Sequence, residues 1–260
     1  MSTAPADYFS PRAAGYAAFR PTYPPALFDF VAALAPGRAC AWDCATGSGQ
    51  AAVALAAHFA RVVATDASAA QLAHAAPHTR VEYRVAAAES SGLPSASAEL
   101  VAVAQALHWF DRDAFYAEAR RVLVPGGAVA VWSYGDPVLA DALLDAPFQH
   151  YVRGVLGAYW PPERRLVGPG YRDIPFPFAE VAAPAFRMER ACTLAEVTGY
   201  VGTWSATTRF VRATGRDSVE ELARALAPHW GDADRRVVVR WPLTVRAGRA
   251  TQTHSFLDAA

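Results

Sequence analysis

The 260-residue sequence predicts a doubly wound α/β fold, in which helices cover both faces of a mostly parallel sheet. Short apolar segments alternate with helical segments along the first half of the chain. This alternation is typical of parallel βαβ units with right-handed crossovers. The chain length and the hydrophobic content of 53% also suit one large core, because single cores stop growing near about 250–300 residues.

The elements of the first half follow from their apolar patterns and their punctuation. Strands are expected at 39–44, 61–66, 80–86, 99–107 and 128–134. Helices are expected at 49–59, 68–75 and 111–123. Ser68 is a good N-cap for the helix that follows it. A further helix precedes the first strand, because Pro24-Pro25 opens an apolar stretch that stops at Pro36-Gly37.

The alternation ends after residue 134. Helices are expected there at 137–158, 193–201 and 217–229, and strands at 179–191 and 237–246. We therefore expect a single domain over 1–260. Its parts are an N-terminal arm at 1–23, a ligand-binding core at 24–134, helical and proline-rich segments at 135–235 that cover the substrate, and a final strand at 236–247.

Composition excludes several classes of function. Lys and Arg balance Asp and Glu at 24 each, so no basic surface for a nucleic acid is expected. No apolar stretch reaches the roughly 20 residues that span a bilayer, and no signal peptide is visible, so we expect a cytoplasmic protein without a membrane partner. The three cysteines and seven histidines lack ligand spacing, so no metal is expected. Monomer and homodimer both remain open.

The segment DCATGSGQ at 43–50 is the main functional signal. It joins a predicted strand to a predicted helix, and Gly47 and Gly49 let the backbone approach a ligand closely. In open α/β sheets, ligands bind at the carboxyl ends of the strands. A nucleotide-like ligand is therefore expected here.

Two classes of nucleotide fit this loop. Gly47-x-Gly49-x-x-Ala52 matches the dinucleotide pattern, which would make the protein an NAD(P)-dependent oxidoreductase. Asp43, at the end of the strand, argues against this alternative because a carboxylate repels a pyrophosphate but attracts an ammonium or sulfonium group. Asp66, at the end of the second strand, suits the ribose hydroxyls of either ligand.

Three further strings, together with this loop, give the chain a resemblance to class I methyltransferases that depend on S-adenosylmethionine (SAM). They are QALHWFD at 105–111, RVLVPGG at 121–127, and Tyr16 with Arg20–Pro24. The chain is most similar to the methyltransferase type 11 branch, near the trans-aconitate methyltransferases. The resemblance implies a Rossmann-like sheet of seven strands whose antiparallel last strand, 237–246, lies beside the fifth. The sequence departs from the family at Ala45, which replaces the first glycine of the loop, and at Ala87, which replaces an aspartate.

The resemblance also implies roles for individual residues. The loop would wrap the methionine moiety of SAM, and Arg20 would pair with the SAM carboxylate. Asp66 would bind the ribose. The stretch around Ala88 and Glu89 would hold the adenine. The implied cofactor site comprises Tyr16, Arg20, Asp43, Ala45, Thr46, Gly47, Gly49, Asp66, Ala67, Ala88, Glu89, Gln105 and His108. The residues expected to touch the methyl acceptor are Tyr23, Trp109, Arg172 and Trp204.

The expected reaction is transfer of a methyl group from SAM to a small molecule, with a carboxylate oxygen as one candidate acceptor. A hydroxyl or amine acceptor needs a base, whereas a carboxylate does not. His108 ends the fourth predicted strand and titrates in the range that suits a base, although a packed histidine without a catalytic role is the alternative. A catalytically inactive SAM-binding protein also remains open, because Ala45 and Ala87 depart from the family pattern.

Overall fold

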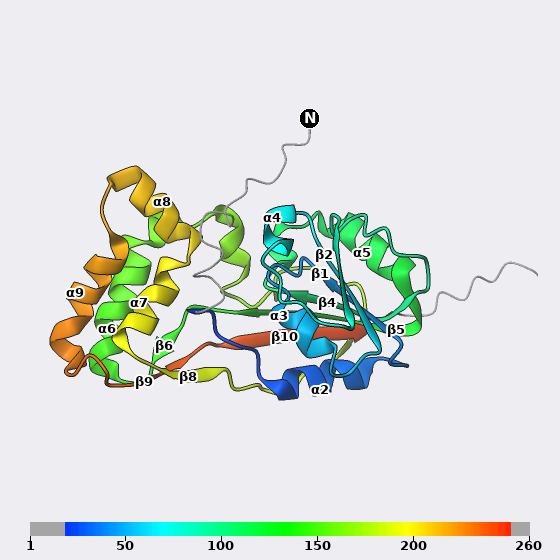
Figure 1. Ribbon diagram of the computed structural model, residues 1–260, viewed down its shortest axis with the longest axis horizontal. Coiled ribbons are helices and arrows are strands. Elements are labelled where there is room, and N and C mark those ends of the chain that lie inside the picture. The colour runs from blue at the N-terminus through cyan, green and yellow to red at the C-terminus, as the bar shows by residue number, and fades with distance from the viewer. Residues whose placement is uncertain (1–18, 251–260) are drawn as a thin grey trace, which may run out of the picture. The chain divides into compact units, whose positions relative to one another are not determined.

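The computed structural model describes residues 19–250, which form two compact units (Figure 1). Of the described residues, the sheet unit comprises Pro24–Ser133, Tyr171–Phe186 and 244–250. The helical unit comprises 19–23, Tyr134–Gly170 and Arg187–Leu243. Among residues 19–250, no helix has the length and apolar content needed to cross a bilayer.

The sheet unit is built on seven strands in the order β3-β2-β1-β4-β5-β10-β7. They are β1 (Cys40–Cys44), β2 (Arg61–Asp66), β3 (Val81–Val85), β4 (Ala98–Ala104), β5 (Leu123–Tyr134), β7 (Ala179–Val181) and β10 (Leu243–Arg249). The first five neighbours in this order pair in parallel, and β10 pairs antiparallel with β7. The predicted doubly wound, mostly parallel sheet of seven strands is therefore confirmed.

Helices cover both faces of this sheet. They are α2 (Pro25–Leu34), α3 (Gln50–Leu55), α4 (Ala69–Leu72) and α5 (Arg112–Val122). The strand registers place Trp42 of β1 and Trp132 of β5 on opposite faces, because side chains alternate along a strand. Trp42 packs against Phe115 of α5, and Trp132 packs edge-on against Phe28 of α2. Both tryptophans are fully buried, so each face carries part of the core.

Several predicted boundaries differ from the observed ones. The strand expected at 237–246 is two strands, β9 (Val237–Arg240) and β10, because Pro242 lacks the N–H that a continuous ladder needs. β9 pairs with β6 (Val138–Leu139) and β8 (Glu189–Cys192) in a separate three-stranded sheet of the helical unit. The helix expected at 68–75 is shorter, although Ser68 caps it as predicted.

Within residues 19–250, the helical unit combines this small sheet with four α-helices. They are α6 (Ala142–His150), α7 (Leu194–Gly202), α8 (Ser205–Thr214) and α9 (Ser218–Trp230), and between α6 and α7 lie η3 (Tyr151–Val155), η4 (Gly157–Tyr159) and η5 (Pro162–Leu166). α7 and α9 confirm the helices expected at 193–201 and 217–229. Asp217 caps α9 by accepting hydrogen bonds from two backbone N–H groups of the first turn.

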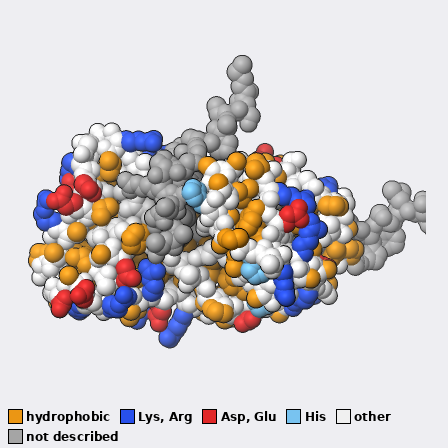
Figure 2. Space-filling view, in the orientation of Figure 1, with side chains coloured by type: hydrophobic (Ala, Val, Ile, Leu, Met, Phe, Trp, Pro, Cys, Tyr) orange, Lys and Arg blue, Asp and Glu red, His pale blue; other side chains and the backbone are white. Residues whose placement is uncertain are grey.

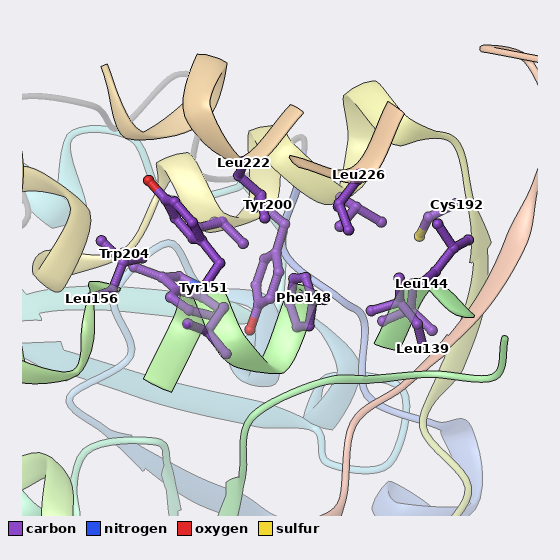
Figure 3. Packing of buried hydrophobic residues seen from close by; sticks show 14 of the residues in the cluster. Leu139, Leu144, Phe148, Tyr151, Leu156, Cys192, Tyr200, Trp204, Leu222 and Leu226 are labelled. Atoms are coloured by element: carbon purple, nitrogen blue, oxygen red, sulfur yellow. The ribbon is translucent and has the colours of Figure 1, made fainter. Parts of the chain in front are cut away.

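The core of the helical unit includes side chains from α6, α7 and α9. Figure 3 shows Phe148, Tyr200, Leu222 and Leu226 pointing toward one another, and each is buried. Complete burial of such side chains stabilises the fold by roughly 1.5–3 kcal/mol each.

Charged side chains of both signs are interspersed on the face of the molecule shown in Figure 2. Many form surface ion pairs, such as the one in which Glu82 of β3 lies between Arg61 and Arg84, at 2.5 Å from each.

Candidate active site

The carboxyl ends of β1 and β4 lie side by side where the strand order reverses. β1 lies between β2 and β4. From β1 the sheet extends through β2 to β3 on one side, and through β4 to β5 on the other side. Ligands of open α/β sheets bind at such a switch point. The loop after β1, the end of β2 and the short helix η2 (Leu107–Trp109) after β4 hold several of the predicted site residues.

Asp43 carries a buried carboxyl group near the end of β1. Its Oδ2 accepts a hydrogen bond of 2.5 Å from the hydroxyl of Thr46. Its Oδ1 is buried and has no hydrogen-bond partner within residues 19–250. Burial raises the pKa of this carboxyl to about 7, and the hydrogen bond from Thr46 and the nearby Ala52 backbone offset only part of that effect. A buried carboxyl oxygen without a donor is costly, and a cation placed beside it would relieve that cost.

Asp66 ties the loop after β1 to the end of β2. Its Oδ2 accepts a hydrogen bond from the backbone N–H of Gly47, and its Oδ1 accepts one from Ser68, each at 2.9 Å. The backbone N–H of Thr46 also donates to the carbonyl of Thr65. Because each carboxylate oxygen accepts two hydrogen bonds, Asp66 can hold the loop and still accept a ligand hydroxyl.

The loop backbone turns through three positions with positive φ, which are Ala45 at 56°, Gly47 at 57° and Gly49 at 80°. Glycine at 49 has a packing reason that the sequence did not reveal. A Cβ there would lie 2.2 Å from the Tyr83 hydroxyl, which itself donates to the carbonyl of Ala76. Gly47 has no comparably close neighbour, with Gln71 Oε1 at 4.0 Å the nearest atom. Of the two glycines, Gly47 is therefore the better candidate for close ligand approach.

The stretch expected to hold adenine is fixed to helix α5. Glu89 Oε1 accepts a hydrogen bond from the backbone N–H of Asp111, the N-cap of α5. Ala88 is buried beside Glu89. This segment therefore has a defined position next to the end of β4.

Glu118 is a residue of this region that the sequence analysis missed. It is buried on α5 and accepts hydrogen bonds from the backbone N–H and the hydroxyl of Ser91, at 2.8 and 2.5 Å. It also pairs with Arg121, which donates to the carbonyl of Leu93. A glutamate on the apolar face of a predicted helix, three residues before an arginine, was the available signal.

The end of β4 brings Gln105, His108 and Trp109 together. Gln105 has a φ of 59°, and its backbone N–H donates to the carbonyl of Trp132. His108 is buried, and its ring lies 4.7 Å from the ring of Trp109, between centroids. His108 Nδ1 lies 2.8 Å from the hydroxyl of Tyr171.

Tyr171 is the second residue that the sequence analysis missed. It lies 63 positions after His108, in a proline- and glycine-rich segment where the neighbouring Arg172 was selected instead. Tyr171 is fully buried, whereas Arg172 is exposed. The positive φ of 61° at Tyr171 has no local sequence signal, because non-glycine residues seldom adopt it.

Three other predicted site residues belong to the helical unit, where they contact two tyrosines. Arg20 donates to the Tyr134 hydroxyl at 3.0 Å, and its guanidinium lies over the Tyr200 ring. Tyr23 packs against Tyr134, and Trp204 packs edge-on against Tyr200. Arginine and aromatic surfaces of this kind suit an organic anion.

The remaining predicted residues are placed simply. Ala67 is exposed directly after β2. Tyr16 lies outside the described residues. Across residues 19–250, no three His, Cys, Asp or Glu side chains form a group that could hold a metal ion.

Comparisons of sequence and of structure with known proteins both relate the chain to methyltransferases. The family model described as a methyltransferase domain matches residues 42–131. The chain is 33% identical over 232 residues to a Dictyostelium discoideum protein assigned as a methyltransferase, and the match covers 88% of each protein. A shorter match, 30% identical over 163 residues, relates 55% of the chain to 51% of the methyltransferase cfoB of Aspergillus candidus.

A solved structure resembles most of the chain. It is an Anaeromyxobacter dehalogenans protein assigned as a type II methyltransferase, with 47% sequence identity and a TM-score of 0.83. The match covers 89% of this chain and 98% of that one. The similarity therefore extends beyond the cofactor-binding half to the segments that follow β5.

Proposed function

The chain belongs to the class I SAM-dependent methyltransferases, and we propose that it transfers the methyl group of SAM to a carboxylate oxygen of a small organic acid. Family membership decides between the two nucleotide classes that fit the glycine loop, in favour of SAM over NAD(P). The protein is thus an enzyme with SAM as its cofactor.

The residues of the sheet unit fit this cofactor, and the carboxyl group of Asp43 is the observation that carries the assignment. Its buried Oδ1 suits the ammonium group of the methionine moiety, which would supply the charge and the donor that this oxygen lacks. The spare lone pairs of Asp66 suit the ribose hydroxyls. The segment at Ala88 and Glu89 would hold the adenine.

Bound SAM supplies a methyl group on a positively charged sulfur, which is electrophilic without help from the protein. The chain's own residues therefore have to orient the acceptor and exclude water. The backbone at Gln105 and the buried rings of His108 and Tyr171 give a rigid wall at the end of β4. A rigid wall is what in-line displacement needs, because small errors in approach lower the rate steeply.

The partner of His108 supports a carboxylate as the acceptor. A histidine that acts as a base is commonly oriented by a carboxylate that stabilises its protonated form. In this protein, Nδ1 of His108 lies 2.8 Å from the Tyr171 hydroxyl. A phenol gives little such support, and a carboxylate acceptor already carries its reactive electron pair, so no proton has to be removed.

Calorimetric titration with S-adenosylhomocysteine (SAH) and with NADH tests the cofactor site. Binding of SAH without binding of NADH is expected. Turnover of methyl-labelled SAM over a panel of small acids, phenols and amines then tests the acceptor, and we expect transfer to the acids. Transfer only to phenols or amines would overturn the acceptor class, and SAH binding without any transfer would favour a catalytically inactive protein.

A further inference from the structure

His108 and Tyr171 form a buried hydrogen-bonded pair in the sheet unit. Their side chains are only 7% and 1% exposed, and Nδ1 of the imidazole lies 2.8 Å from the phenol oxygen. The two rings are inclined at 34°, with their centroids 5.9 Å apart, and the Trp109 ring also contacts the imidazole. These contacts hold the imidazole in one orientation.

Tyr171 reaches this position only through an unfavourable backbone conformation. Its φ is 61°, and the preceding Gly170 has a φ of 64°. A left-handed conformation at a non-glycine residue costs on the order of 1–3 kcal/mol and persists only where the surroundings enforce it. Strain of this kind points to a role for the side chain that the conformation presents.

Arg246 of β10 supplies the enforcing contacts. Its guanidinium donates to the carbonyl oxygens of Tyr171 and Ile174, at 2.7 and 2.5 Å. It is itself held by Glu180 of β7 and lies over the ring of Phe176. The outer strands of the sheet therefore determine where the Tyr171 hydroxyl lies.

The chemistry of the two groups sets the direction of their hydrogen bond. A phenol O–H is a stronger donor than a neutral imidazole N–H, and an imidazole nitrogen is a stronger acceptor than a phenol oxygen. These strengths favour the arrangement in which the Tyr171 O–H donates to Nδ1 of His108. Neutral histidine carries one N–H, so in that arrangement the proton of the ring is on Nε2.

We propose that Tyr171 is a positioning residue that fixes His108 with its proton on Nε2, so that His108 acts as a hydrogen-bond donor to the acceptor carboxylate and not as a base. The donor role rests on the proposed carboxylate acceptor. The tautomer rests only on the contact with Tyr171. A donor on Nε2 would hold one carboxylate oxygen while the other is methylated.

NMR of the histidine rings tests the tautomer directly. Two-bond ¹H–¹⁵N spectra are recorded at about pH 8, where a histidine of ordinary pKa is neutral, and the signals lost in His108→Gln identify His108. We expect a protonated Nε2 and an unprotonated Nδ1 in the wild type, and a mixture of tautomers in Tyr171→Phe. A proton on Nδ1 in the wild type, or an unchanged tautomer in Tyr171→Phe, would overturn the proposal.

Tyr116→Phe is the matched control for this measurement. Tyr116 is a buried tyrosine of the same unit, and within the described residues its hydroxyl has no hydrogen-bond partner. Removing that hydroxyl should leave the His108 signals and the fold unchanged. Altered His108 signals in this control would show that the tautomer responds to general packing, which would contradict a specific role for Tyr171.

Turnover with the most active acid of the panel tests the donor role. His108→Ala should lower kcat by roughly 100-fold, because the acceptor carboxylate would lose the contact that orients it and misplacement of a reactant by about 1 Å has an effect of that size. His108→Gln should recover most of that loss, because its amide N–H can replace Nε2–H but cannot act as a base. Tyr171→Phe should lower kcat while SAH affinity stays unchanged. Equal loss in the Gln and Ala variants would establish a base instead. Methylation of phenols alone would refute the proposed acceptor and leave the tautomer result intact.

Discussion

Glu118 on α5 accepts hydrogen bonds from both the backbone N–H and the hydroxyl of Ser91, at 2.8 and 2.5 Å. Through this contact, the helix fixes the end of the segment that starts at Ala87 and holds Ala88 and Glu89. Arg121 completes the arrangement, because it pairs with Glu118 and donates to the Leu93 carbonyl. The position of the proposed adenine-binding segment thus depends on one buried carboxylate.

Replacing that carboxylate should destabilise the protein in a pH-dependent way. The bonds from Arg121 and Ser91 lower the pKa of Glu118 from 4.5 to about 2. A lowered folded-state pKa stabilises the fold fully above about pH 4.5, and the stabilisation disappears as the pH falls toward 2. Urea unfolding should show Glu118→Gln to be less stable by roughly 3 kcal/mol at pH 7, with a smaller difference below about pH 4.5.

A surface glutamate provides the control for Glu118. Glu220 pairs with Arg224 one turn later on α9, and both side chains are mostly exposed. Glu220→Gln should change stability by no more than about 0.5 kcal/mol at any pH. We also expect Glu118→Gln, but not Glu220→Gln, to weaken SAH binding. Unchanged SAH affinity in a folded Glu118→Gln variant would show that the segment does not depend on Glu118.

Asp43 should make the unliganded protein less stable as the pH rises. Its folded-state pKa is raised from 3.8 to about 7, so its contribution to stability is lost as the pH rises from about 4 through 7. The full difference amounts to roughly 4 kcal/mol. Asp43→Asn has no such loss, so the variant should gain stability relative to the wild type across this range, as measured by thermal unfolding. Parallel pH profiles for the two proteins would contradict this assignment.

SAH affinity should have the opposite dependence on pH. The ammonium group of the ligand favours ionised Asp43, so the affinity of the wild type should rise from about pH 6 and level off above the pKa of about 7. Calorimetry near pH 6.5 in buffers of different ionisation enthalpy should detect release of a proton on binding. Asp43→Asn should bind weakly and without proton release. A flat affinity profile in the wild type would argue against contact between Asp43 and the ammonium group.

Alanine substitutions at Gly49 and Gly92 distinguish the cost of backbone strain from the cost of a steric clash. Both have positive φ, at 80° and 69°, but only Gly49 has a neighbour that a Cβ would strike, since nothing lies within 4 Å at Gly92. Gly92→Ala should cost about 1 kcal/mol from strain alone. Gly49→Ala should cost more, because the Tyr83 ring has to move. Urea unfolding measures the loss in the free energy of unfolding of each variant. Equal losses would mean that the Tyr83 ring can move aside without destabilising the fold.

Ala45 allows the opposite change, from alanine to glycine at a position with positive φ. It has a φ of 56°, where the family usually has glycine. Ala45→Gly relieves strain in the folded state but increases the entropy of the unfolded chain, and the two effects are each about 1 kcal/mol. Stability should therefore change little, and SAH affinity should be kept. A loss of SAH affinity would show that the Ala45 methyl group contacts the cofactor.

Local patterns predicted the parts of the site that depend on strand ends and caps. Asp43 and Asp66 were visible because each ends an apolar segment, and Ser68 was visible as a helix cap. Pro242 was an available signal for the break between β9 and β10, since proline interrupts strand ladders. The sequence analysis nevertheless predicted one strand, because the residues on both sides of Pro242 share one apolar pattern.

Contacts between residues far apart in the sequence could not be predicted from local sequence patterns. The Tyr171 hydroxyl meets His108 only because Arg246, far along the chain, holds the Tyr171 carbonyl. No periodicity links these three positions. The close approach of Tyr83 to Gly49 likewise depends on how the loop after β1 packs beside β3. Such contacts follow from tertiary packing, which a single sequence does not encode in its spacing.

The chemical stability of the methylated product tests the central claim most directly. The enzyme is incubated with methyl-labelled SAM and the panel of small acids, phenols and amines, and the labelled products are treated with alkali. A methyl ester is hydrolysed and releases the label as volatile methanol, whereas methyl ethers and methylamines are stable. Label released as methanol is the result expected for a carboxylate acceptor, and label that stays in an alkali-stable product would contradict it.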